Sequence, residues 1–193
     1  SFSIRLDDLA KSLPVRSELH LFRKVWHMLT GLAIVSVYMS GVLSHSNALL
    51  VLGAILTFCL SLETVRLKVP SVNEKCLKFL APIVRTNEVH RISGVPYYVA
   101  SSLLAIALFP KSIAMLSLLY LAVGDPVASF FGVLFKKRSV QIIPGKSLHG
   151  TAAGFACCAI ITWLFLQQDG YVGLSLLRLS ILGGFAGALA ELL

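Results

Sequence analysis

Long apolar runs with few charged residues dominate this sequence and restrict what it can fold into. A helix needs about 20 predominantly apolar residues to cross the hydrocarbon core of a membrane. Six runs of this kind lie at 25–44, 47–66, 92–109, 111–135, 148–167 and 172–193. Only 13% of the residues are charged, whereas about a quarter are charged in a typical soluble domain. The sequence therefore predicts an all-α fold, a polytopic membrane helix bundle with about six transmembrane helices.

The spacing of the runs indicates one membrane domain at 25–193, preceded by a polar, basic segment at 1–24 that is cytoplasmic or interfacial. For that segment, an interfacial amphipathic helix and a disordered tail both remain open. Two long polar connections, 67–91 and 136–147, separate runs that are otherwise joined by very short turns. We expect no cleavable signal peptide, because the polar segment comes before the first apolar run. We also expect both ends of the chain to be trimmed.

The basic residues set the expected orientation in the membrane. Fifteen of the 17 Lys and Arg residues lie in the N-terminal segment or in the two long connections with their flanks. The positive-inside rule places those segments in the cytoplasm, and an even number of spans places both ends there as well. The net charge of +8 favours phosphate, nucleotide or anionic lipid as partners, and no nucleic acid is expected.

Three acidic residues lie within the apolar runs or at their ends: Glu63, Asp125 and Glu191. An ionisable group in a membrane span costs a few kcal/mol, so its presence indicates a function by default. Glu63 and Glu191 lie near the ends of their runs, where they could instead reach the membrane interface.

Asp125 lies about ten residues before the end of its run, so roughly 15 Å deep on a straight helix. Pro126 follows it and cannot donate a hydrogen bond to the carbonyl of Ala122. The Gly-Asp-Pro sequence at 124–126 therefore predicts an opened helix turn in which a carboxylate and a free carbonyl face one point. Such breaks are tolerated where they line a polar cavity, and a metal ion or a proton would be a natural occupant. The alternative is a helix kink with a buried, hydrogen-bonded Asp.

A second group of candidate residues precedes the fifth apolar run. The turn Gly145-Lys146-Ser147 opens a predicted helix, and such a turn presents free backbone N–H groups to phosphate. It is not a Walker A loop, which would need glycine at Val140 and a preceding strand. The alternative for the basic residues is an ordinary positive-inside flank. The predicted nucleotide-binding set is Lys136, Lys137, Arg138, Gly145, Lys146, Ser147 and Thr151.

Two more polar clusters are expected on the same side of the membrane, one before the first run and one at the end of the first long connection. They are Arg23, Lys24 and His27, and Arg85, Glu88 and Arg91. Each cluster alone is an ordinary juxtamembrane flank. Together, acids and bases at one membrane face suit an enzyme that joins a water-borne anion to a membrane-borne lipid.

Small residues predict where helices approach closely. Two pairs of glycines are spaced four residues apart, as in the small-xxx-small patterns of packed membrane helices: Gly150 with Gly154, and Gly183 with Gly187. The four cysteines form no C-x-x-C pattern and are interpreted as small apolar packing residues.

Five short motifs, taken in order, resemble those of a known family. They are Arg23-Lys24-Val-Trp-His27, Glu63-Thr-Val-Arg66, Arg85-Thr-Asn-Glu88 through Gly94, Gly124-Asp125-Pro126 through Gly132, and Gly145-Lys146-Ser147 through Thr151. The ordered set resembles the CTP-dependent lipid kinases, which include dolichol kinase, phytol kinase and the yeast-type diacylglycerol kinase. The resemblance covers about 18–193, nearly the whole chain.

The resemblance implies transfer of the γ-phosphoryl group of CTP to a membrane lipid alcohol, which could be a polyprenol such as dolichol, phytol or diacylglycerol. It also implies Mg²⁺ or another divalent cation, with Asp125 as a ligand and Glu88 or Glu63 helping through oxygen atoms. Asp125 could instead be the base for the lipid hydroxyl, and both roles remain open. The candidate catalytic residues are Asp125, Glu63 and His149, the last standing where family members often carry Glu. The family continues beyond Glu191 with a further polar motif and span.

Two other functions remain open. A cytidylyltransferase that makes CDP-diacylglycerol also joins CTP to a lipid at a metal site, but it releases pyrophosphate where a kinase releases CDP. A small membrane transporter would be favoured by inverted repeats and a midplane site, and no such repeat is evident in the sequence. The sequence leaves the oligomeric state undefined.

Overall fold

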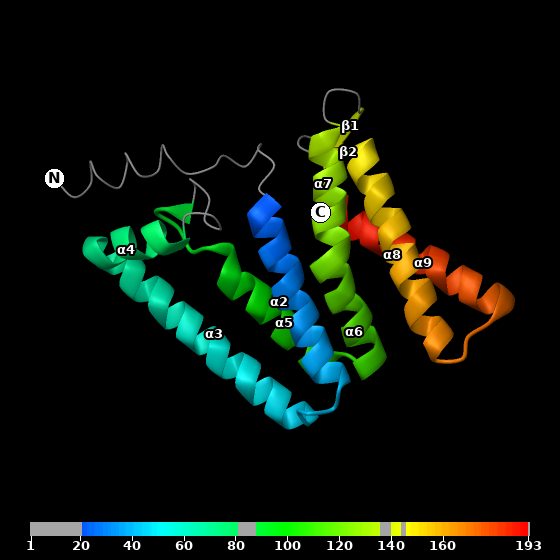
Figure 1. The fold of residues 1–193 in the computed structure, drawn as a ribbon, viewed down its shortest axis with the longest axis horizontal. Helices are drawn as coiled ribbons and strands as arrows, with labels where there is room; N and C mark the ends of the chain where they lie inside the picture. The colour runs from blue at the N-terminus through cyan, green and yellow to red at the C-terminus, as the bar shows by residue number, and fades with distance from the viewer. Residues whose placement is uncertain (1–20, 81–87, 136–139, 144–145, 193) are drawn as a thin grey trace. The chain divides into compact units, whose positions relative to one another are not determined.

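The computed structural model describes residues 21–80, 88–135, 140–143 and 146–192 (Figure 1). Several predictions made from the sequence lie outside these residues: the interfacial helix or tail within 1–20, Arg85, the basic triplet at 136–138, and Gly145.

Helices occupy all six predicted apolar runs. They are α2 (Leu21–Met39), α3 (His45–Lys68), α5 (Gly94–Leu108), the helix Lys111–Leu134, α8 (Leu148–Gln168) and α9 (Gly173–Leu192). The predicted all-α membrane fold is confirmed. Four of the described helices are long and apolar enough to cross a membrane: α3, Lys111–Leu134, α8 and α9. Because α5 is a shorter apolar helix, the count of six spans stays a prediction.

The helix Lys111–Leu134 changes its hydrogen-bonding pattern in the middle. It begins as α6 (Lys111–Leu119), passes through the π-helical turn η2 (Tyr120–Gly124), and continues as α7 (Asp125–Leu134). The change falls where the sequence predicted an opened turn, directly before Asp125 and Pro126.

Both long polar connections contain structure that the sequence did not predict. The first contains α4 (Pro70–Leu80), which begins at a proline, a residue favoured in the first turn of a helix. Asn73 and Leu77, four residues apart, form its buried face. The second contains a short antiparallel hairpin of β1 (Gln141–Ile143) and β2 (Lys146–Ser147).

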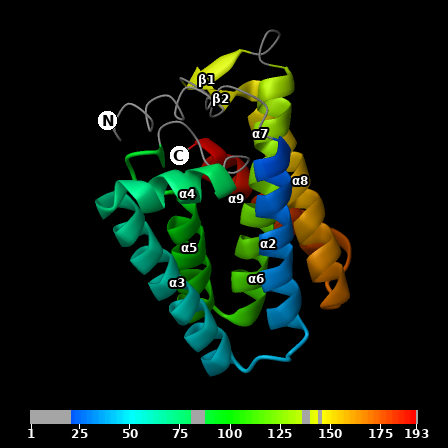
Figure 2. The ribbon, with the colours of Figure 1, turned by 60° about the vertical axis from the view of Figure 1, so that its left-hand side comes forward.

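The chain divides into two compact units. Among the described residues, the first contains 21–26 together with those of Val37–Pro110, and the second contains His27–Ser36 together with those from Lys111 onward. In the first unit, α3 packs against both α4 and α5, as Figure 2 shows. Its buried apolar side chains include Leu52, Leu77 and Ile106.

Close packing of α8 with α7 and α9 organises the second unit. A Cβ added at Gly154 would lie 3.0 Å from the Cβ of Ala128 in α7, and one at Gly150 would lie 2.9 Å from the carbonyl oxygen of Ala128. At Gly187 in α9, an added Cβ would collide with the Cys158 side chain of α8. The predicted role of the spaced glycines in helix packing is confirmed.

These contacts predict that Gly187→Ala lowers the midpoint of thermal unfolding in detergent. The added methyl group overlaps the Cys158 side chain, and overpacking of this kind costs about 1–3 kcal/mol. The matched control is Gly53→Ala in α3, where an added Cβ meets nothing within 4 Å. We expect the control to unfold at or above the temperature of the unmodified protein, since Ala favours a helix over Gly. Equal midpoints for the two variants would contradict the tight α8–α9 contact.

Candidate active site

The turn before Asp125 is opened by the proline that follows it. The backbone N–H of Asp125 donates to the carbonyl of Tyr120, five residues back, instead of to Leu121. A proline lacks an N–H, and its ring clashes with the carbonyl four residues earlier. A wider π turn relieves this clash, and single π turns inside α-helices occur often at functional sites. The structure thus has a widened turn where the sequence predicted an opened one, whereas the prediction that a free carbonyl and the Asp125 carboxylate face one point stays a prediction.

The shift leaves one carbonyl without its usual backbone donor. The Leu121 carbonyl would accept from Asp125 in an α-helix or from Pro126 in a π-helix, but the first N–H is committed to Tyr120 and the second does not exist. His27 of α2 lies within reach, with its Nε2 atom 2.8 Å from the Leu121 oxygen. Because a carbonyl only accepts, Nε2 must carry the proton and donate.

The Asp125 side chain lies on the open face of this helix. It is exposed, whereas Gly124 and Pro126 beside it are buried. Among the described residues, its carboxylate makes no hydrogen bond or ion pair. The alternative of a kink around a buried, hydrogen-bonded Asp is therefore wrong. A carboxylate on a membrane-spanning helix is costly against lipid, so this face suits water, a polar head group or a cation.

The hairpin after α7 holds Lys146 against the end of α9. The Lys146 ammonium lies 3.0 Å from Oε1 of Glu191 and also donates to the backbone carbonyl of Glu191. An ammonium group has three N–H donors, so Glu191 occupies two and one remains for another acceptor. The sequence marked both residues but did not predict that they pair.

Most of the hydrogen-bond donors at the start of α8 already donate to acceptors within the protein. Ser147 caps the helix, its hydroxyl oxygen accepting from the Gly150 N–H at 3.2 Å, and the Leu148 N–H donates to Val140 at 3.0 Å. The Thr151 hydroxyl donates to the Ser147 carbonyl. Two of the first three N–H groups of the helix therefore have partners, and the predicted phosphate-binding role of this turn stays a prediction.

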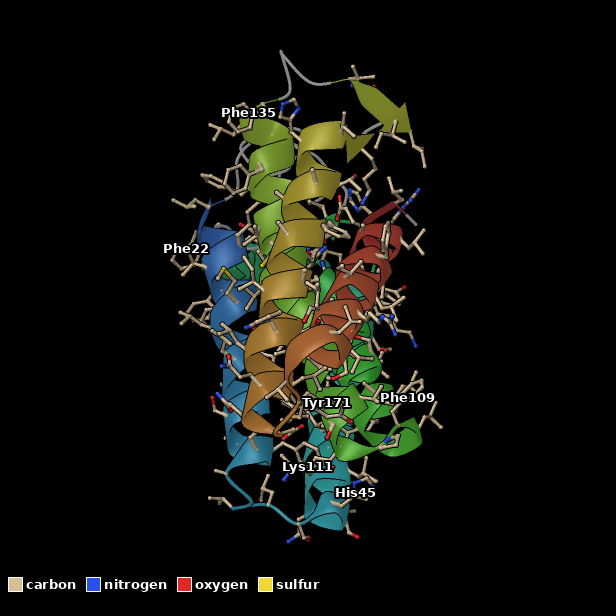
Figure 3. All side chains as sticks on the ribbon, turned by 90° about the vertical axis from the view of Figure 1, so that its right-hand side faces the viewer. Phe22, His45, Phe109, Lys111, Phe135 and Tyr171 are labelled. Atoms are coloured by element: carbon tan, nitrogen blue, oxygen red, sulfur yellow. The ribbon has the colours of Figure 1, made fainter. Side chains whose placement is uncertain are left out.

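His149 stacks on an aromatic ring at the same end of the second unit. Its ring centroid lies 5.3 Å from that of Phe135, with the two ring planes 27° apart. Figure 3 shows Phe135 at the end of α7. Lys111 and Tyr171 lie at the opposite end of this unit, so the hairpin residues gather at one end of its helices.

The first unit contains a separate polar network centred on Arg66, which is only 4% exposed. Its guanidinium donates to five acceptors: the side chains of Glu63 and Asn73 at 2.6 and 2.9 Å, and the carbonyls of Glu88, Val89 and Arg91 at 3.1, 3.4 and 2.8 Å. The same Glu63 oxygen accepts from the Ser93 N–H at 3.1 Å. The network fastens residues 88–93, which lead into α5, to the end of α3.

This network places Glu63 and Asn73 in positions that support the fold. Glu63 is 8% exposed and its Oε2 atom serves both Arg66 and the Ser93 backbone. Its predicted catalytic role stays a prediction, because nothing in the described residues tests it. The sequence reasoning missed Asn73, since a single polar residue in a polar connection carries no distinguishing signal.

Arg23 and Glu88 form a two-point ion pair within the first unit. Nη1 and Nη2 of Arg23 lie 3.0 and 3.1 Å from the two Glu88 oxygens. A Cβ added at Gly94 would lie 2.8 Å from Nη2, so glycine leaves room for the pair. The Arg91 side chain is exposed while its carbonyl joins the network, and Lys24 and His27 lie partly buried on α2.

The acidic residues differ in their fitness for a divalent cation. Mg²⁺ is usually held by one or two carboxylates together with substrate phosphates and water. The exposed Asp125 fits that role, whereas both Glu88 oxygens already accept from Arg23. Within the described ranges, no group of three or more His, Cys, Asp or Glu side chains is placed to hold a metal ion. The role of Glu88 as a metal ligand therefore stays a prediction, and Arg23 competes with a metal ion for its two oxygens.

Comparison with known proteins matches residues 10–193 to the cytidylyltransferase family. The chain belongs to this family. Its relatives include the CTP-dependent diacylglycerol kinase 1 of Eremothecium gossypii, 31% identical over 186 residues that cover 88% of this chain and 58% of that protein. The protein of the same name from Saccharomyces cerevisiae is 29% identical over 188 residues, covering 88% of this chain and 64% of that one.

A third relative, the CTP-dependent diacylglycerol kinase 1 of Schizosaccharomyces pombe, is 28% identical over 137 residues, 67% of this chain and 63% of that protein. The predicted resemblance to CTP-dependent lipid kinases is confirmed by these relatives. The chain spans about three-fifths of the length of the curated relatives it matches. No solved structure matches it.

The Arg66 network predicts a stability defect for Arg66→Lys. A lysine keeps the charge but has only three donors and cannot reach acceptors spread around a planar guanidinium, and each buried acceptor left without a donor costs about 1–3 kcal/mol. The midpoint of thermal unfolding in detergent should therefore fall clearly. The control is Lys78→Ala, which removes an exposed pair with Glu74 and should change the stability by less than about 0.5 kcal/mol.

Glu63→Gln separates the structural role from the predicted catalytic one. Loss of stability with near-normal turnover per folded molecule is expected if Glu63 chiefly holds Arg66 and Ser93. A fully stable variant without turnover would return Glu63 to the catalytic set.

Proposed function

We propose that this protein is a CTP-dependent lipid kinase that transfers the γ-phosphoryl group of CTP to the hydroxyl group of a membrane lipid alcohol. The observation that carries the proposal is the exposed Asp125 carboxylate at a widened turn of a membrane-spanning helix. The names of the relatives support CTP as the donor and make diacylglycerol the first acceptor to test, ahead of dolichol and phytol. The cytoplasmic face is proposed from the distribution of basic residues.

Phosphoryl transfer depends mainly on positioning and on neutralising the charge of the phosphates. Asp125 would hold Mg²⁺ or take the proton of the lipid hydroxyl. A bound divalent cation would supply positive charge next to the phosphates. The third donor of Lys146 would reach a phosphate oxygen while Glu191 holds the ammonium in place.

Residues of the connection between α7 and α8 complete the proposed nucleotide site. Lys136, Lys137, Arg138 and Gly145 precede Lys146 in the sequence, and their proposed role is to add charge and backbone donors for the phosphates. His149 and Thr151 lie in the first turn of α8, where the proposed role of Thr151 is to bind the nucleotide and that of His149, which stacks on Phe135, is catalytic.

The family description favours one second candidate function. A cytidylyltransferase would attach the cytidylyl group of CTP to phosphatidate and release pyrophosphate. Membranes containing the protein should be supplied with CTP labelled at either the α or the γ phosphate, Mg²⁺ and a panel of lipids. Transfer of the γ label to diacylglycerol or another lipid alcohol supports the kinase. Transfer of the α label to phosphatidate identifies the cytidylyltransferase and contradicts the kinase proposal.

Asp125→Asn should reduce lipid phosphorylation by about a hundred-fold or more, because metal and acid–base roles carry factors of that size. The variant should still purify as a folded protein, since a neutral amide costs less in a membrane than a carboxylate. Turnover per folded molecule is the quantity to measure. The matched control is Asp169→Asn, at an exposed residue that follows α8, and its turnover should stay near normal. Near-normal turnover in folded Asp125→Asn would exclude the proposed site.

Lys146→Ala should raise the apparent KM for CTP by about ten- to a hundred-fold, because a charge-assisted contact contributes roughly 1.5–3 kcal/mol. The dependence on lipid concentration should change little. Glu191→Gln should raise the same KM by less, since the amide oxygen still accepts from Lys146 without its charge. Lys111→Ala, at the opposite end of the second unit, is the control. An unchanged KM for CTP in Lys146→Ala would assign that lysine to the membrane flank.

A further inference from the structure

We infer that His27 is a positioning residue that keeps the turn before Asp125 open, by donating to the Leu121 carbonyl that Pro126 leaves without a backbone donor. The inference deepens the proposed function and rests on it for the consequence on turnover. Its structural part rests on the geometry of residues that lie within one compact unit.

The first step is the donor count at the Leu121 carbonyl. The residues four and five positions later are Asp125, whose N–H is on Tyr120, and Pro126, which has no N–H. Helix Lys111–Leu134 is long and apolar enough to span a membrane. There, water does not replace a missing donor, and an unsatisfied carbonyl is costly. A side-chain donor from another helix meets the need, and the His27 Nε2 atom is placed 2.8 Å away.

The second step links that hydrogen bond to the direction of Asp125. If His27 is removed, the nearest donor able to return to the Leu121 carbonyl is the N–H of Asp125. Its return would pull the π turn toward an α turn, against the clash of the Pro126 ring with the Ala122 carbonyl, and a full shift of one residue would rotate the later part of the helix by about 100°. Asp125 would then leave the face that it occupies in the open turn. His27 therefore acts on Asp125 through the register of the helix, without touching it.

The third step explains why the residue is a histidine. Nε2 of histidine is a ring N–H at the end of a stiff side chain, and it donates in both the neutral ring with the proton on Nε2 and the charged ring. Glutamine can place an amide N–H at a similar reach from the backbone, whereas alanine has no donor. If His27 acts only as a hydrogen-bond donor, glutamine should substitute for it better than alanine does.

A double-mutant cycle between His27 and Pro126 tests the inference without any activity measurement. His27→Ala alone should lower the midpoint of thermal unfolding by about 4–8 °C, as expected for a partly buried carbonyl left without a donor. Pro126→Ala restores an N–H and lets the helix return to the α register, in which Asp125 serves Leu121. In that background, His27→Ala should cost less than half as much. His27→Gln should retain most of the stability that His27→Ala loses.

The control is His45→Ala, because His45 is hydrogen-bonded through Nδ1 to the Tyr38 hydroxyl at 3.0 Å in the first unit. Its effect should be the same with and without Pro126→Ala. Equal costs of His27→Ala in the two backgrounds would overturn the inference. If His27→Ala does not purify, recovery of a folded protein in the double variant supports the inference, and failure of both variants overturns it.

Turnover supplies the second readout. Folded His27→Ala should lose about ten-fold or more in kcat, with a much smaller change in the KM for CTP, and His27→Gln should recover part of the lost kcat. If His27 contacted the nucleotide, its removal would change the KM for CTP more than kcat. That result would overturn the inference. If the double-mutant cycle shows the coupling between His27 and Pro126 but no variant phosphorylates lipid, the proposed function is rejected. The positioning role of His27 is still supported in that case.

Discussion

A backbone carbonyl inside a membrane needs a donor, and the sequence of this protein removes one at Pro126. The proline has no N–H and cannot approach the carbonyl four residues earlier. The helix widens, the N–H of Asp125 moves to Tyr120, and the Leu121 carbonyl receives a hydrogen bond from His27 instead. The exposed Asp125 directly follows this rearrangement in the chain, so the proposed active site adjoins the point where a single missing N–H is compensated.

The same constraint is met by a different residue in the first unit. Arg66 donates to three backbone carbonyls of the segment 88–93, and Glu63 accepts from the backbone of Ser93. An irregular segment at the end of a helix thereby satisfies its polar groups through two buried, oppositely charged side chains. The arrangement is specific because the guanidinium has donors in fixed directions, and it explains why charged residues lie buried in a largely apolar protein.

The acids that the sequence marked as chemically competent fall into two classes. Glu63, Glu88 and Glu191 each accept from a cationic side chain, respectively Arg66, Arg23 and Lys146. Asp125 has no such partner among the described residues. A carboxylate already paired with a cation contributes to the fold or to the placement of that cation. One that is exposed on a membrane-spanning helix is suited to bind a divalent ion or take a proton, and the proposed chemistry therefore centres on Asp125.

Most of the helical fold and the position of the open turn could be predicted from the sequence alone. Apolar runs of membrane-spanning length favour helices wherever they pack, and the missing N–H of Pro126 is a covalent property of the chain. The sequence did not show that α4 would form, because Asn73 and Leu77 gain their burial from the packed first unit. Nor could it show that Lys146 pairs with Glu191. Partners far apart in the sequence meet only after helices pack, and it is this packing that decides which side chain reaches an unpaired charge or carbonyl.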